Sequence, residues 1–103
     1  MSYVLLFVQK YQPSAAAVFF QLEAEFAELE RRSPQFPQGR RYQLLAEGEP
    51  TNTLLWQCEF ASLEDLHHAL QEMSDDPTHI ALFAKQLPYI VEMRTEIYQR
   101  LAL

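Results

Sequence analysis

Residues 53–66 read TLLWQCEFASLEDL, and this segment decides the fold because it joins a strand to a helix. Between Leu54 and Phe60, large apolar residues recur at every second position, which is typical of a strand with a buried face. Ser62 then offers a helix cap and is followed by acidic residues that suit a first helical turn. We therefore expect a strand over Thr53–Phe60 and a helix that begins after Ser62.

The N-terminal part of the chain predicts an earlier strand and helix. Tyr3–Tyr11 is almost continuously apolar, which indicates a strand that is covered on both faces. Ser14 can cap a helix, and from there to Leu29 apolar residues follow one another mostly in steps of three and four. The acidic residues of this helix are most simply a solvated face, and Ser33–Gly39 forms a loop.

The remaining segments complete the order of elements. Arg40–Glu47 is predicted to be a strand that forms a hairpin with Thr53–Phe60, through turn-forming residues 47–52. Asp76 can cap a further short helix, which has Pro77 at its first position and ends before Pro88. A final strand is expected over Tyr89–Leu101, where apolar and charged residues alternate.

Strand, helix, strand, strand, helix, strand is the order of an α+β, ferredoxin-like βαββαβ fold. It predicts a four-stranded antiparallel sheet with helices on one face. The chain has 103 residues, of which 49% are hydrophobic. That length fits one core, so we expect residues 1–103 to form a single domain.

The charge balance disfavours several classes of partner. Fourteen acidic and eight basic residues give a net charge of −6. Nucleic-acid binding requires a positive surface, and anionic membranes attract basic ones, so we expect no nucleic acid and no membrane as partner. The apolar N-terminus lacks the features of a signal peptide. The expected location is the cytoplasm, where a single reduced cysteine is ordinary.

Alternation along the strands divides their side chains between two faces. We expect the almost wholly apolar set to lie under the helices: Val4, Leu6, Val8, Tyr42, Leu44, Ala46, Leu54, Trp56, Cys58, Phe60, Val91, Met93 and Ile97. The opposite face is mixed: Tyr3, Leu5, Phe7, Gln9, Arg41, Gln43, Leu45, Thr53, Leu55, Gln57, Glu59, Glu92, Arg94, Glu96 and Tyr98. Such a surface suits a second sheet packed across a partly open cavity, and the alternative is a solvated face with scattered apolar residues.

Three segments carry a resemblance to a known family: residues 54–66, Asp76–His79 and Met93–Tyr98. They resemble NIPSNAP-like proteins of the dimeric α/β-barrel superfamily, although Tyr3–Val8 differs from the usual first strand of that family. The resemblance implies a homodimer whose two sheets close a barrel. Members of the superfamily include cofactor-free and haem-degrading monooxygenases, isomerase-like enzymes and many proteins of unassigned activity.

Several polar and aromatic residues are candidates for a site on the mixed face. The candidate catalytic residues are Glu59 and His79, and the candidate substrate-binding residues are Tyr3, Phe7, Arg41, Gln57, Arg94 and Tyr98. Each polar candidate has a structural alternative. Arg94 could belong to a self-neutralising charge ladder, or could anchor an anion or carbonyl. Glu59 could pair with Arg41 or Arg94, or act as a general base.

His79 could pack beside its helix, or, as the superfamily resemblance implies, serve as a base or haem ligand. No metal-ligand spacing connects the histidines, and we expect no metal and no resident cofactor. Cys58 should be buried and therefore inert. The leading hypothesis is a homodimer that binds a small molecule in a cavity between the two sheets. The alternatives are a cofactor-free or haem-dependent monooxygenase or isomerase-like enzyme acting on a small aromatic or polyketide-like molecule, and a purely structural dimer.

Overall fold

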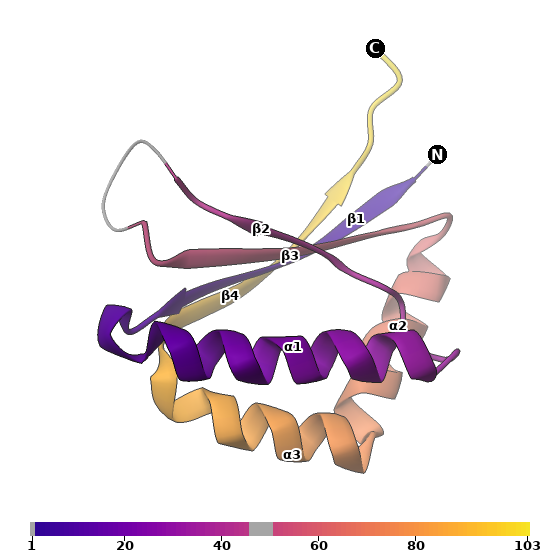
Figure 1. Cartoon of the computed structure of the whole chain (residues 1–103). Coiled ribbons are helices and arrows are strands. Elements are labelled where there is room, and N and C mark those ends of the chain that lie inside the picture. The colour runs from indigo at the N-terminus through magenta and orange to yellow at the C-terminus, as the bar shows by residue number, and fades with distance from the viewer. Residues whose placement is uncertain (1, 46–50) are drawn as a thin grey trace.

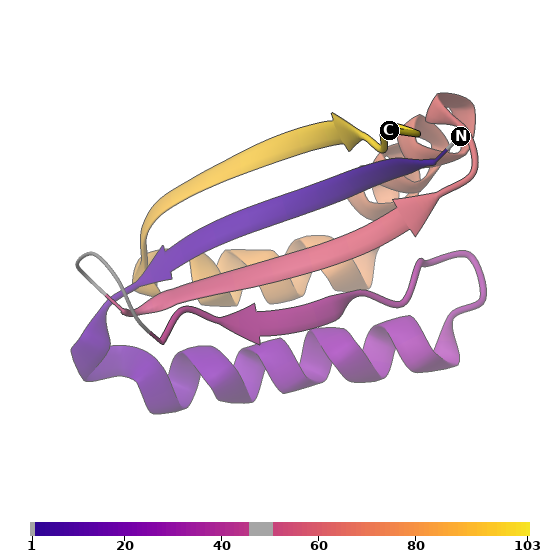
Figure 2. The ribbon, with the colours of Figure 1, turned by 90° about the horizontal axis from the view of Figure 1, so that it is seen from above.

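The fold is built on one antiparallel sheet with helices on one of its faces (Figures 1 and 2). The computed structural model describes residues 2–45 and 51–103. The strands β1 (Tyr3–Tyr11), β2 (Arg40–Gln43), β3 (Thr53–Phe60) and β4 (Ile90–Gln99) lie in the order β2-β3-β1-β4. This arrangement confirms the predicted α+β, ferredoxin-like βαββαβ class.

The helices are α1 (Ala16–Arg32), α2 (Leu63–Asp75) and α3 (Pro77–Gln86). Two of the predicted caps are present, because Ser62 Oγ accepts from the Asp65 backbone N–H and Asp76 Oδ2 accepts from the His79 N–H. The predicted Ser14 cap is wrong. Pro13–Ala15 forms a short 3₁₀ turn before α1, and the side chain at the start of α1 makes no capping bond.

The second strand is shorter than its sequence predicts. It ends at Gln43 instead of Glu47, although the Leu44 backbone N–H still donates to the carbonyl of Thr53 at 3.0 Å. Most of the predicted hairpin turn lies outside the described residues.

Within residues 2–45 and 51–103, no helix has both the length and the apolar character that crossing a bilayer requires.

The strand register corrects the predicted face of β1 and β2. Leu5 lies opposite Cys58, and Arg41 lies opposite Trp56. Directly paired residues share a face, so Tyr3, Leu5, Phe7, Gln9, Arg41 and Gln43 lie under the helices, and Val4, Leu6, Val8, Tyr42 and Leu44 lie on the open face. The sequence predicted the reverse for these two strands. For β3 and β4 the register agrees with the predicted alternation: Leu55, Gln57 and Glu59 share the open face with Glu92, Arg94, Glu96 and Tyr98.

The core fills the space between the sheet and the helices. Leu5 and Trp56 project from the sheet into a cluster with Phe26 of α1 and Leu66 of α2. A second cluster near the start of α1 contains Tyr11, Phe19 and Leu54. Helices α1 and α3 run beside each other below the sheet in Figure 1. The sheet, α1 and α3 together provide residues that line a cavity in this part of the fold.

Leu5 gives a direct test of this register. The Leu5 side chain is 0% exposed, so Leu5→Ala leaves a cavity in the core and should lower the free energy of unfolding by about 2–5 kcal/mol. Leu45→Ala is the matched control, because Leu45 is 83% exposed and its truncation should cost less than about 0.5 kcal/mol. Urea denaturation measures both, and equal losses in the two variants would contradict the assigned face.

Candidate functional site

A cavity of about 410 Å³ lies between the helix-facing side of the sheet and the helices. Its walls are largely aromatic and aliphatic, and Glu23, Glu30, Arg41 and Gln86 are among the polar residues that line it. The residues that line it include Phe7, Phe26, Trp56, Phe83, His79 and Gln86. Met93 of β4 and Ile80 of α3 also line it, and they are 46% and 50% exposed, so the cavity opens to solvent between these two elements.

The aromatic wall is rigid because its rings pack on one another. Phe7 of β1 stacks on Trp56 of β3, with 4.9 Å between ring centroids and an interplanar angle of 22°. On the opposite side, Phe26 of α1 meets the His79 ring edge-on at 5.0 Å. Aromatic contacts of this kind hold a defined geometry, so two walls of the cavity present fixed ring surfaces.

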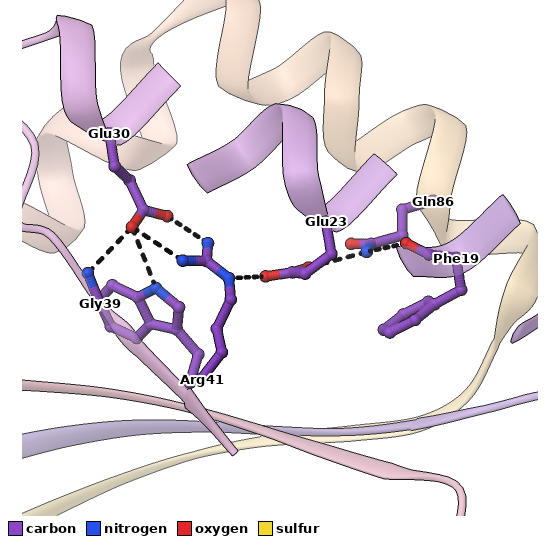
Figure 3. A network of polar contacts seen from close by, with 7 residues as sticks. Phe19, Glu23, Glu30, Gly39, Arg41 and Gln86 are labelled. Atoms are coloured by element: carbon purple, nitrogen blue, oxygen red, sulfur yellow. Dashed lines mark hydrogen bonds and ion pairs between the residues drawn. The ribbon is translucent and has the colours of Figure 1, made fainter. Parts of the chain in front are cut away.

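Arg41 stands at the centre of the polar end (Figure 3). Its Nε donates to Glu23 Oε2 at 2.6 Å, and its Nη2 donates to Glu30 Oε2 at 2.5 Å. Nη1 donates to the other Glu30 oxygen at 3.2 Å. The guanidinium therefore binds Glu30 through two nitrogens and Glu23 through the third, and these bonds connect β2 to α1.

Burial alone would lower the pKa of Arg41, but the hydrogen bonds and charges of Glu30 and Glu23 outweigh it and raise that pKa above its ordinary value. Arg41 is therefore a permanent cation inside the fold.

Further contacts hold each carboxylate in place. Glu30 Oε1 accepts from the backbone N–H of Gly39 at 2.9 Å, and also from Trp56 Nε1 at 3.5 Å. A side chain at position 39 would collide with the Trp56 indole, which explains the glycine there. Glu23 Oε1 accepts from Gln86 Nε2 at 2.9 Å. The network thus joins α1, α3 and the two strands around one end of the cavity.

His79 presents a neutral ring to the cavity. Burial lowers its pKa below the ordinary value, although the charges of Asp76, Glu30 and Glu23 work in the opposite direction. Its backbone is held by the Asp76 cap, and its ring lies against Phe26 and Phe36. Among the residues that the structure describes, neither ring nitrogen has a recorded hydrogen-bond partner. The imidazole can therefore accept or donate a proton toward a bound molecule.

The structure brings only some of the sequence candidates together. Phe7, Arg41 and His79 line the cavity, and Arg94 lies at its edge. Gln57, Glu59 and Tyr98 lie on the opposite face of the sheet. Tyr3 is on the helix side but packs against the core cluster and does not line the cavity.

The ion pairs on the open face also differ from the prediction. Glu59 pairs with Arg100 at 3.7 Å, and not with Arg41 or Arg94 as predicted. Arg94 donates to Glu96 at 2.9 Å, and the Tyr98 hydroxyl donates to the other Glu96 oxygen at 2.9 Å. These bonds agree with the charge-ladder alternative for Arg94. Glu59 lies on the open face of the sheet, whereas His79 lies on the helix side.

The sequence did not predict the roles of Glu23 and Glu30, because the acidic residues of α1 are expected to form a solvated face. Gln86, at the end of α3, was not among the candidates either. Glu23 is only 6% exposed. A usable signal was present: Glu23, Phe26 and Glu30 are spaced by three and four residues, so they share one side of the helix. Their side borders the apolar stripe, whereas Glu28 lies outside it and pairs with Arg31 at the surface.

The chemistry of Cys58 agrees with the sequence prediction. The side chain is half-buried on the helix-facing side, and burial raises the pKa of its thiol. A raised pKa keeps the sulfur protonated and weakly reactive. No cluster of three or more His, Cys, Asp or Glu side chains within residues 2–45 and 51–103 is arranged to hold a metal ion.

The ion pairs of Arg41 should be important for stability. Arg41→Met leaves the carboxylates of Glu23 and Glu30 without their cation, so it should lower the free energy of unfolding by about 2–4 kcal/mol. Arg40→Met is the matched control, because Arg40 is exposed on the open face. Urea denaturation of both variants measures the difference, and equal stabilities would show that the network contributes nothing.

The buried ring of His79 should make stability depend on pH. Its pKa in the folded protein lies below the value of about 6.5 expected in the unfolded chain. The unfolded chain therefore binds more protons in this window, and stability should fall as the pH drops below about 6.5. Denaturation between neutral and acidic pH measures this slope, which His79→Gln should reduce and His68→Gln, at an exposed position of α2, should reduce less. An NMR titration of the His79 ring with a midpoint above 6.5 would refute the argument.

Comparison with known proteins identifies relatives of the fold. No protein-family model matches the sequence, and no curated protein matches it. A NIPSNAP family protein from Agrobacterium tumefaciens has a similar structure, with a TM-score of 0.78 and 13% identity over 99% of this chain and 95% of that chain. An uncharacterised NIPSNAP-like domain protein from Burkholderia xenovorans matches with a TM-score of 0.74 and 18% identity, over 98% and 86% of the two chains. The cofactor-independent oxygenase SnoaB from Streptomyces nogalater matches with a TM-score of 0.66 and 14% identity, over 96% and 92%. The chain therefore shares the fold of these two NIPSNAP proteins and of this oxygenase.

Proposed function

We propose that this protein is a homodimer in which each chain binds a small, largely aromatic molecule in the cavity between its own sheet and helices. The observation that carries the proposal is the cavity itself: aromatic walls enclose about 410 Å³ and converge on His79 and the Arg41 network. Pockets for small organic molecules span about 300–1,000 Å³ and combine apolar walls with a few polar groups. The sequence placed the ligand between two sheets, but this cavity belongs to a single chain.

The open face of the sheet supports the proposed homodimer. Val4, Leu6, Val8 and Leu55 form an apolar strip along its centre. Val8 is only 8% exposed and the other three are half-buried, whereas the neighbouring Tyr42 is 46% exposed. The helices cover only the other face (Figure 2). An apolar strip that no helix covers is a typical protein-binding surface, and the resemblance to the dimeric α/β-barrel superfamily supports pairing through it.

A second candidate function is chemistry on the bound molecule, by an oxygenase or isomerase. One observation favours it: His79 is a neutral base in a largely apolar cavity, where it could remove a proton from a bound substrate. The likeness to a cofactor-independent oxygenase agrees with this function. Glu59, the other predicted catalytic residue, lies across the sheet, so His79 would act without it. Oxygen uptake in the presence of a bound aromatic molecule distinguishes the oxygenase from a binding protein.

Binding can be followed on the single tryptophan of the chain. Indole should enter the cavity, shift the side-chain N–H resonance of Trp56 and release measurable heat. Thr95→Phe should weaken binding about tenfold or more, because Thr95 lines the cavity beside its opening and a larger side chain would obstruct it. Thr78→Phe, on the exposed side of α3, should leave binding unchanged. If indole causes neither shift nor heat, the cavity does not bind aromatic molecules and the proposal is wrong.

The dimer is tested by a charge placed on the open face. Leu55→Glu would bury an unpaired carboxylate between two sheets and should convert the dimer to a monomer, as measured by light scattering at micromolar concentration. Leu63→Glu is the matched control on the helix side, where Leu63 is 42% exposed, and it should remain dimeric. A monomeric parent protein, or a Leu55→Glu variant that stays dimeric, would refute pairing through this face.

A further inference from the structure

We propose that the molecule held in the cavity carries a hydrogen-bond donor and no negative charge, and that a protonated amine is the group the cavity selects best. This inference rests on the proposed binding function and concerns the polar end of the same cavity. It comes from the orientation of one buried amide, the two carboxylates already bound to one guanidinium, and the net charge of these groups.

The Gln86 side chain provides an acceptor without a donor. Gln86 is 0% exposed and lines the cavity. Its Nε2 donates to Glu23 Oε1 at 2.9 Å and to the backbone carbonyl of Phe19 at 3.4 Å (Figure 3). Both of these neighbours are acceptors only, so the amide must turn its nitrogen toward them and its oxygen away. That oxygen, Gln86 Oε1, has no hydrogen-bond partner in the described structure.

An unpaired buried acceptor is costly for a folded protein, by about 1–3 kcal/mol. A bound molecule that donates a hydrogen bond to Gln86 Oε1 would remove this cost. A molecule that brings only acceptors would leave Gln86 Oε1 unpaired and lose its own hydration. The amide therefore favours ligands that end in an ammonium, a hydroxyl or an amide N–H.

Arg41 does not make the cavity favour negatively charged ligands. Its Nε, Nη1 and Nη2 all donate to the carboxylates of Glu23 and Glu30. These bonds use three of the five N–H groups of the guanidinium, so a ligand carboxylate that approached the other two would lie beside the carboxylates of Glu23 and Glu30, which would repel it. The most prominent cation of the cavity is thus already neutralised, and it does not form an anion site.

The charges that line the cavity also favour a positively charged ligand. Glu23 and Glu30 carry two negative charges against the one positive charge of Arg41, and His79 is neutral because of its burial. Arg94 contributes to the edge of the cavity, but its side chain is bound to Glu96. One uncompensated negative charge at the buried end attracts an ammonium and repels a carboxylate, and the low-dielectric surroundings strengthen both effects.

Three probes of matched size test the charge preference: benzylamine, benzyl alcohol and benzoate, each measured by calorimetry and by the Trp56 N–H resonance. We expect benzylamine to bind tightest, benzyl alcohol next, and benzoate about tenfold or more weaker than benzylamine. Equal binding of the three, tighter binding of benzoate, or binding of indole but of none of the three would each overturn this inference and leave the proposed function standing. If indole fails as well, the proposed function itself is wrong.

Glu23→Gln changes the preference without changing the size of the side chain. It removes the excess negative charge and introduces an amide N–H that can pair with Gln86 Oε1, so the preference for benzylamine over benzoate should largely disappear. Glu25→Gln is the matched control, because Glu25 is exposed on α1 and does not line the cavity. It should keep the full preference. A Glu23→Gln variant that folds, binds indole and still selects benzylamine to the same extent would refute the role of this network.

Discussion

The ion pairs of Arg41 with Glu23 and Glu30 are the constraint on which the architecture around the cavity depends. They fasten a short edge strand to α1 across the helix-facing side of the sheet. Without this link, β2 is held to the rest of the structure mainly by its pairing with β3. Because the same carboxylates also accept from Gly39, Trp56 and Gln86, one guanidinium organises contacts with three parts of the fold. Desolvation of the charges offsets much of the stability that the intact network provides, but removing the cation alone is costly because it leaves two buried carboxylates unpaired.

This geometry gives the cavity two unlike ends. The aromatic side, where Phe7 stacks on Trp56 and Phe26 meets His79, provides shape and apolar surface for any flat molecule. The polar end would orient a bound molecule, because Gln86 Oε1 has no hydrogen-bond donor and the two carboxylates of Glu23 and Glu30 outnumber the single cation of Arg41. Apolar contact would supply most of the affinity of a ligand, whereas the polar end would decide which functional group is accepted.

The two faces of the sheet have separate roles in this proposal. The helix side holds the cavity, and the open side, with its apolar strip and its Arg94–Glu96–Tyr98 hydrogen bonds, would meet a second copy of the chain. Such a division lets the binding site vary without disturbing the dimer contact. It is also compatible with the range of proteins that share this fold, which includes both uncharacterised NIPSNAP proteins and a cofactor-independent oxygenase.

The sequence by itself determined the order of the elements and the helix caps at Ser62 and Asp76, because periodicity and capping are local properties of the chain. Only the tertiary structure decided which face of β1 lies under the helices. Tyr3–Val8 is apolar at every position, so alternation carries no information there, and pairing of Leu5 with Cys58 had to set the face. A shift of one residue reverses every side chain of a strand, which is why Arg41 moved from the expected dimer surface into the cavity. The spacing of Glu23 and Glu30 indicates that they share one side of α1, but their pairing with Arg41 joins distant segments that only the folded sheet and helix bring together.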